Sequence, residues 1–173
     1  MPVPQPKKSL DEIVSAVGRY PMDAYLFVQE CVSLATERVH GAPSPGQIAV
    51  IKWMSEHELS PEQLQELAEQ GELPVEVAAG IEQSGGLERM NRHVTGQQLC
   101  GAIRDIALER WGLMARGVLA RWNIHRTEDI GAIVFALVEN DWLQKQPTDS
   151  IDDFNQVFDF DLAFDRSYQI GVG

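Results

Sequence analysis

The stretch TEDIGAIVFALV, residues 127–138, carries the clearest helical period in the chain. Its apolar residues recur at intervals of three and four, the spacing of one face of an α-helix. These residues are Ile130, Ile133, Val134, Leu137 and Val138. Glu128 and Asp129 fall in the expected first turn, where the helix dipole favours negative charge. We therefore expect a helix from Thr127 to about Asn140, and a fold built mainly from helices.

Two more helices are expected immediately before this one. Thr95 and Gln98 have the spacing of a capping box, in which each side chain bonds the backbone of the other residue at a helix start. Apolar residues follow at helical spacing, and the next helix is expected over residues 113–122. Asn123 suits the left-handed conformation that ends many helices.

Cys100 and His93 flank this capping box and raise the question of an active site. Cys100 falls on the apolar face of the expected helix, where a free thiol usually behaves as a small hydrophobic residue. A reactive cysteine needs exposure and a cationic or helix-terminal setting, and Cys100 is about one turn inside the helix. The stretch therefore predicts a helix start with a core cysteine, and an enzyme built on Cys100 and His93 is the alternative.

After residue 141 the apolar spacing changes toward two, which predicts a small β-hairpin near the C-terminus. Its strands are expected at residues 142–146 and 156–161, with a turn at 147–153, although the alternation in the second strand is imperfect. The alternative is a short helix that begins at Ser150, with Asp153 completing a weak capping box. Three helices followed by a hairpin is the order of a winged-helix domain, so the sequence predicts a mainly α fold, and a winged-helix-like fold is one candidate.

The N-terminal part of the chain predicts two further helices. Residues 1–8 are rich in proline and are expected to be disordered. Ser9 and Glu12 have capping-box spacing, and Pro21 suits the first position of a second helix. The apolar side chains of that second helix form one stripe that is expected to be buried and to end at Gly41. They are Tyr25, Val28, Val32, Ala35 and Val39, with Leu26, Cys31 and Leu34 beside them.

Residues 42–91 differ in character from the segments on either side. GAPSPG (41–46) and SGG (84–86) are linker signals, and three short helices are expected between them. Nine acidic and two basic residues lie in residues 47–91. We therefore expect an acidic helical insertion at 42–91 in a core helical domain. That domain is expected to comprise residues 9–41 and 92–165, with a flexible tail at 166–173.

Three blocks of sequence resemble a small family of uncharacterised bacterial proteins found mainly in Planctomycetes and Verrucomicrobia. The blocks are RYPMDAYLFVQE, HVTGQQLCGAIRDIALERWGLMARGVLARWNIHRTEDIGAIVFALVENDWL and DSIDDFNQVFDFDLAF. The resemblance covers residues 19–40 and 92–164. Members of the family connect the first block to the second by a short loop, whereas here residues 42–91 intervene. The resemblance implies these domain boundaries and a bacterial cytoplasmic origin, and it implies no activity and no catalytic residue.

Residues 92–126 form a basic segment in a protein whose net charge is −12, with six arginines against two acidic residues. Arginine side chains suit carboxylate or phosphate groups, so the segment supplies candidate contacts for a protein partner or an anion. The candidates are Arg104, Arg110, Arg116, Arg121, His125 and Arg126. The favoured alternative is that these arginines form internal salt bridges with Asp105, Glu109 and the acidic C-terminal segment.

The sequence lacks the common motifs of phosphate binding, nucleophilic catalysis and zinc catalysis. Its four histidines are far apart and its two cysteines are isolated, whereas a structural zinc site needs four ligands. Asp159, Asp161 and Asp165 lack the glycine that a calcium loop needs at its sixth position, which here is Phe164. We therefore predict no catalytic residue, no metal and no cofactor, and the sequence leans against an enzyme.

Composition and charge narrow the function classes. The N-terminus has no secretory signal, and the longest apolar stretch, residues 130–138, is too short to span a bilayer. We expect a cytoplasmic, non-catalytic protein-interaction or regulatory module that binds a protein partner or a second copy. One alternative is a winged-helix nucleic-acid-binding protein that presents residues 127–138 or the arginines before them, although the acidic charge of that helix opposes phosphate. The other is an enzyme of unrecognised type.

Overall fold

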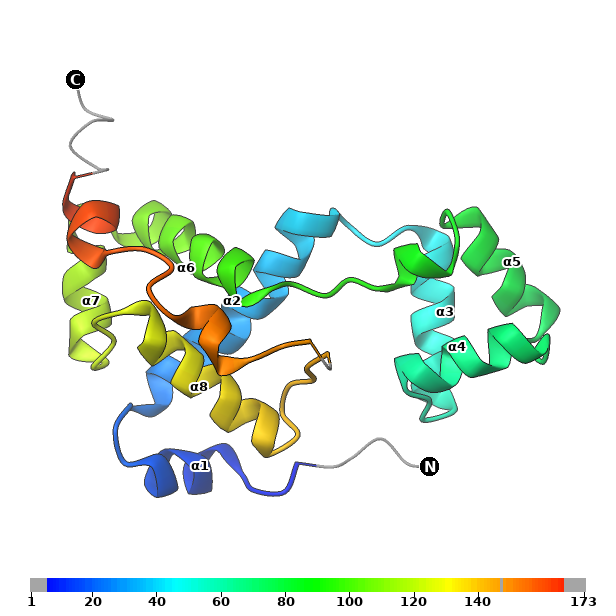
Figure 1. Cartoon of the computed structure of the whole chain (residues 1–173), viewed down its shortest axis with the longest axis horizontal. Helices are drawn as coiled ribbons and strands as arrows, with labels where there is room; N and C mark the ends of the chain where they lie inside the picture. Colours follow the sequence, from blue (N-terminus) through cyan, green and yellow to red (C-terminus); the bar gives the residue numbers. More distant parts are fainter. Residues whose placement is uncertain (1–5, 147, 167–173) are drawn as a thin grey trace. The chain divides into compact units, whose positions relative to one another are not determined.

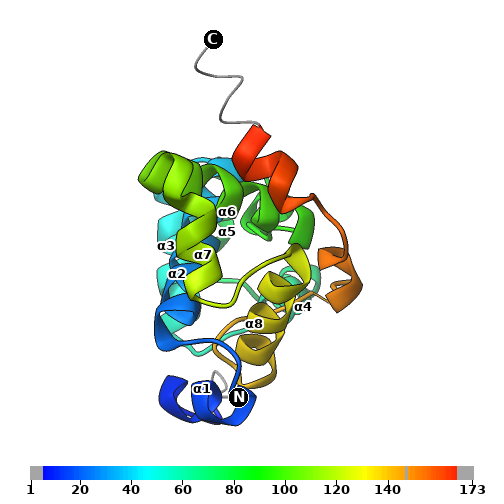
Figure 2. The same cartoon turned by 90° about the vertical axis from the view of Figure 1, so that its left-hand side faces the viewer.

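The computed structural model describes residues 6–146 and 148–166, and this part of the chain consists of helices and loops without a strand (Figures 1 and 2). The elements are α1 (Leu10–Val17), α2 (Met22–His40), α3 (Pro45–Glu56), α4 (Pro61–Gln70), α5 (Val75–Gln83), η1 (Leu87–Met90), α6 (Gly96–Trp111), η2 (Gly112–Met114), α7 (Ala115–Arg121), α8 (Thr127–Glu139), η3 (Ile151–Phe154) and η4 (Asp161–Arg166). The predictions for residues 1–5, 147 and 167–173 fall outside the described residues.

The chain divides into two compact units. The middle unit, residues 40–93, contains α3, α4, α5 and η1. The main unit comprises the described residues of 6–39 and 94–166 and contains the remaining helices, with α2 belonging to it as far as Val39. Each unit has its own cluster of buried apolar side chains.

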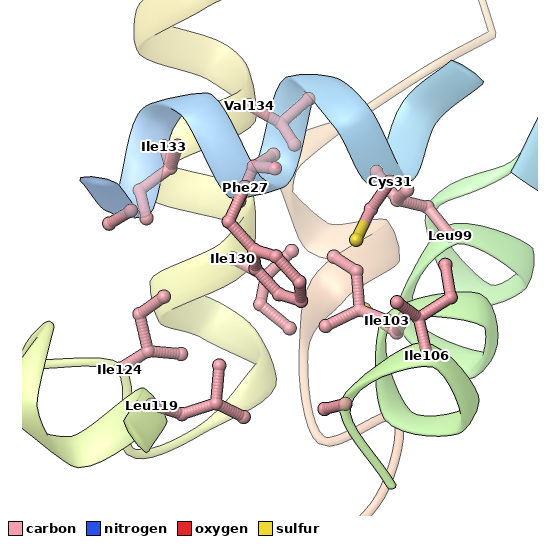
Figure 3. Close-up of a cluster of buried hydrophobic side chains, with 14 of the residues drawn as sticks. Phe27, Cys31, Leu99, Ile103, Ile106, Leu119, Ile124, Ile130, Ile133 and Val134 are labelled. Atoms are coloured by element: carbon pink, nitrogen blue, oxygen red, sulfur yellow. The ribbon is translucent and has the colours of Figure 1, made fainter. Parts of the chain in front are cut away.

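Helix α8 is the central helix of the main unit. Only Glu139 among its residues is exposed, and the helix packs against α1, α6 and η3. Figure 3 shows Phe27 of α2 directed toward Ile103 of α6 and Ile130 of α8. The helix that the sequence predicted most clearly therefore forms, and only one side of it is partly exposed, at Glu128, Ala132, Phe135, Val138 and Glu139.

The prediction of a C-terminal β-hairpin is wrong. Residues 142–146 form bends and loop, and residues 151–154 form the short helix η3. The alternative helix start at Ser150 is confirmed, because the Ser150 N–H donates to Asp153 at 3.0 Å and the Asp152 N–H donates to the Ser150 hydroxyl at 3.2 Å. A local cap, rather than a strand partner, therefore determines how this segment folds.

The position of Phe154 explains why this segment forms the helix η3 and not part of a hairpin. Its buried ring packs on two glycines that are far away in the sequence, Gly96 of α6 and Gly131 of α8. A Cβ atom on Gly131 would lie only 2.7 Å from the Phe154 Cβ atom. The two helices therefore lack side chains where η3 docks against them.

The backbone around Phe154 is bonded by side chains from the first turn of α8. The Thr127 hydroxyl donates to the Phe154 carbonyl at 2.6 Å and accepts from the Val157 N–H at 3.2 Å. The Gln156 N–H donates to the Glu128 carboxylate at 2.7 Å. These bonds satisfy backbone groups that a hairpin would have paired across strands.

The middle unit is a small arrangement of three helices. Its buried apolar side chains are Val50, Leu64, Val77 and Ile81. Helices α3 and α5 approach closely at two glycines, because a Cβ atom on Gly46 would lie 2.7 Å from the Gly80 carbonyl oxygen. Capping boxes begin α3 at Ser44 and α4 at Ser60.

The two ends of the middle unit are hydrogen-bonded to each other. The His40 Nε2 atom lies 2.7 Å from the His93 carbonyl oxygen, and Arg92 donates to the Gly41 carbonyl at 2.6 Å. The chain therefore enters and leaves the middle unit at neighbouring points.

Candidate protein-interaction surface

The most exposed large apolar side chains of the main unit lie at the corner between α6 and α7. Gly112 ends α6 with a φ of 52°, a value that favours glycine, and the chain then forms η2. Leu113 and Met114 follow, with 67% and 71% of their surface exposed. Two adjacent large apolar side chains therefore lie in solvent at this corner.

Helix α7 continues this surface. Ala115 and Leu119 are buried and hold the helix against the main unit, whereas Gly117, Ala120 and Arg121 are exposed. A Cβ atom added at Gly117 would meet nothing within 4 Å. We call the exposed group the η2–α7 surface, and its members are Leu113, Met114, Gly117, Ala120 and Arg121.

An aromatic cluster supports both ends of the segment that carries this surface. The ring of Phe27 lies 5.2 Å from that of Trp111 and 5.4 Å from that of Trp122, between ring centroids. The two tryptophan rings meet edge to face at 5.7 Å. Such aromatic pairs stabilise the packing of both ends of the segment against the main unit.

The segment that carries the surface is basic in sequence, although Asp161 and Asp165 of η4 lie beside α7 and pair with Arg116. Residues 110–127 contain no aspartate or glutamate, although the whole chain has 26. Arg121 is exposed and has no hydrogen-bond or ion-pair partner in the part of the chain that the structure describes. It is therefore a cation available to a partner without the loss of an internal bond.

Three of the candidate arginines form internal ion pairs. Arg110 donates to both carboxylate oxygens of Glu30, at 2.9 and 2.5 Å, and these bonds lower the pKa of Glu30. Arg104 donates to Asp105 at 3.0 Å. Arg116 lies between the carboxylates of two η4 residues, Asp161 and Asp165; helices α7 and η4 are neighbours in Figure 2.

The remaining candidates are His125 and Arg126, in the turn before α8. Both are exposed, and the His125 ring Nε2 atom lies 3.1 Å from the Asn123 side-chain oxygen. Because Arg104, Arg110 and Arg116 each bind a different set of carboxylates, the candidates do not act together as one anion site.

The first turn of α8 contains a buried carboxylate, Asp129, which the sequence identified only by its position near the helix start. Asp129 is 2% exposed and accepts hydrogen bonds from the Tyr20 hydroxyl at 2.7 Å and from the His125 N–H at 2.9 Å. Arg19 pairs with it at 3.2 Å. Burial, and then the bond to Asp129, raise the pKa of Tyr20. The carboxylate is fully bonded, so it ties the start of α2 to the start of α8 rather than holding a substrate.

The structure gives no support to a cysteine nucleophile. Cys31 and Cys100 are buried, and burial raises the pKa of each thiol to about 12. The reactive thiolate is therefore scarce at neutral pH. Across residues 6–146 and 148–166, no group of three or more histidine, cysteine, aspartate or glutamate side chains is placed to hold a metal ion.

Comparisons with protein-family models, with curated proteins and with solved structures give no match to this chain. The resemblance to the bacterial family therefore stays a prediction. No helix among the described residues is long and apolar enough to cross a membrane.

Proposed function

We propose that the protein is a non-catalytic interaction module of the bacterial cytoplasm that binds a protein chain through the η2–α7 surface. The observation that carries the proposal is the adjacent exposure of Leu113 and Met114 at the corner between α6 and α7. Scattered exposed apolar residues are normal, but contiguous ones mark interaction surfaces. Methionine and arginine are also enriched at interfaces, and this surface presents Met114 and Arg121.

The energetics favour this surface over the paired arginines. Burial of a leucine or methionine side chain contributes roughly 1.5–3 kcal/mol. Arg121 can bond a partner carboxylate without breaking an internal pair, whereas Arg110 and Arg116 would first have to leave Glu30 and the two η4 aspartates. We therefore expect Leu113, Met114 and Arg121 to contribute most of the affinity.

The winged-helix hypothesis requires an exposed recognition helix and a hairpin that acts as a wing. A recognition helix must present an exposed face to the DNA groove, whereas α8 has one exposed residue, Glu139, and four partly buried ones. The hairpin that would act as a wing is absent from the described residues. Arg121 and Arg126, which precede α8, are exposed, but the exposed apolar side chains of Leu113 and Met114 suit a protein partner better than a phosphate backbone.

Photo-crosslinking tests the proposal. A benzophenone amino acid at position 114 of the full chain, expressed in the cell of origin, is expected to give a discrete crosslinked product. The matched control carries the same amino acid at Leu26, another exposed apolar residue of the main unit. A product that is equally strong at both positions, or no product at position 114, would contradict the proposal.

A further inference from the structure

The chemistry of the η2–α7 surface also indicates what kind of partner binds there, and this inference rests on the proposed function. We infer that a second copy of this chain occupies the surface with the corner between its α4 and α5, residues 71–76. This corner belongs to the middle unit, and the surface that it contacts belongs to the main unit of the other copy.

The α4–α5 corner presents one apolar side chain between two carboxylates. Val75 is 85% exposed, more than any other large apolar side chain that the structure describes. Glu72 and Glu76 flank it and are exposed. Leu73 packs against the core of the middle unit, and Pro74 restricts the backbone where α5 begins. The corner is therefore anchored and holds Val75 outward.

The two surfaces are complementary in polarity and in charge. The η2–α7 surface has exposed apolar side chains beside Arg121, which has no ion-pair partner among the described residues, within a segment that lacks acidic residues. The corner has an exposed apolar side chain beside two glutamates, and residues 53–88 contain no lysine or arginine. Opposite charges around an apolar centre steer two surfaces together and determine their orientation.

The same charges oppose symmetric pairing. Two copies of the η2–α7 surface would bring like charges together, and so would two copies of the corner. A contact between unlike surfaces is heterologous, so it produces rings or open chains rather than one symmetric dimer. We therefore expect association to continue beyond two copies as the concentration rises.

Another exposed apolar face of the middle unit fits less well. Ile48 and Ile51 of α3 are exposed, but Lys52 and Glu56 form an ion pair on the same helix, with their charged atoms 4.0 Å apart. That helix therefore lacks the net negative charge that would complement Arg121. The double variant Ile48→Ser/Ile51→Ser is for this reason the matched control.

Complementation between two variants of the full chain tests the inference. One variant, Met114→Ser/Arg121→Ser, lacks the η2–α7 contact, and the other, Val75→Ser/Glu76→Ser, lacks the corner contact. All four positions are exposed, so circular dichroism is expected to match that of the unmodified chain. In sedimentation velocity each variant alone is expected to be monomeric, and the equimolar mixture is expected to form a 1:1 dimer.

The unmodified chain supplies a second readout that does not depend on variant folding. Its average mass is expected to rise with concentration past two copies and to fall with added salt, which screens the charges. With the crosslinker at position 114, mixed ¹⁴N- and ¹⁵N-labelled chains are expected to give mixed-isotope products that contain Val75. Single-isotope products only, a monomeric unmodified chain, or loss of association in the Ile48→Ser/Ile51→Ser control would each overturn the inference.

The two proposals fail in different ways. If position 114 crosslinks to a different protein while the chain remains monomeric, the proposed function stands and the second-copy inference is wrong. If position 114 gives no product and the chain remains monomeric, both are wrong.

Discussion

At the scale of single residues, two buried tyrosine hydroxyls of the main unit lie in opposite environments. The Tyr20 hydroxyl donates to Asp129 at 2.7 Å. The Tyr25 side chain is 0% exposed, and within the described residues its hydroxyl has no hydrogen-bond partner. A buried hydrogen bond stabilises the fold, whereas a buried hydroxyl without a partner loses the bonds that it made to water.

The matched variants Tyr20→Phe and Tyr25→Phe are therefore expected to differ in sign or size. Tyr20→Phe leaves Asp129 with one donor fewer, and it should lower the free energy of unfolding by about 1–3 kcal/mol. Tyr25→Phe removes only the unpaired hydroxyl, so the free energy of unfolding should stay unchanged or rise by up to about 1 kcal/mol. Urea unfolding followed by tryptophan fluorescence measures both, and an unchanged free energy of unfolding in Tyr20→Phe would show that the bond to Asp129 does not stabilise the fold.

The cysteines supply a second prediction at this scale. Both thiols are expected to react slowly with a thiol reagent in the folded protein and quickly in denaturant, because burial excludes the reagent and raises the pKa of each to about 12. The ordinary value is 9.0, so the unfolded chain loses these protons first. The protonated thiols therefore stabilise the folded state fully below about pH 9, and this stabilisation is lost as the pH rises toward 12. Rapid labelling of folded Cys100 would revive the enzyme hypothesis.

At the scale of elements, helix starts were predictable from sequence because the interactions that make them are local. The box predicted at Thr95 is confirmed, with the Thr95 N–H donating to Gln98 at 3.0 Å, and a box of the same kind begins α4 at Ser60. The left-handed conformation of Asn123 is confirmed by a φ of 62°. The box at Ser44 has the same Ser-Pro-x-Gln pattern as the one at Ser60, but the prolines and glycines of residues 41–46 led to a linker prediction instead.

Which face of a helix is buried was harder to predict, because neighbouring helices decide it. The sequence placed Leu26 at the edge of the buried stripe of α2, yet it is 48% exposed, and the adjacent Phe27 is buried instead. Likewise, Leu113 and Met114 follow a helical apolar pattern that resembles a core face, so the sequence singled out only the arginines around them. The lack of acidic residues in 110–127 was the visible signal that this segment differs.

The docking of η3 could not be predicted from local spacing, since it depends on two distant glycines. Gly131→Ala would place a methyl group 2.7 Å from the Phe154 Cβ atom, so we expect a loss of about 1–3 kcal/mol in the free energy of unfolding. The control is Gly101→Ala in α6, where an added Cβ meets nothing within 4 Å and helix propensity predicts a gain of up to about 1 kcal/mol. Thermal denaturation compares the two, and a neutral Gly131→Ala would mean that η3 does not dock there.

At the scale of the whole molecule, the two units differ in how much apolar surface they bury. The buried cluster of the middle unit has four residues, whereas that of the main unit draws on α1, α2, α6, α7, α8, η3 and η4. A small core leaves little free energy to offset the conformational entropy lost on folding. The main unit therefore has the larger basis for independent stability.

Replacing residues 44–90 with a short Gly/Ser linker tests whether the main unit folds without the middle unit. The hydrogen bonds of His40 with His93 and of Arg92 with Gly41 show that a few residues suffice to join the two chain ends. Short loops cost little closure entropy, and the buried cluster of the main unit contains no residue from 40–93. The shortened chain is therefore expected to keep a helical circular dichroism spectrum and a cooperative urea transition. An insoluble product, or a transition without cooperativity, would instead mean that the main unit needs residues 44–90 to fold.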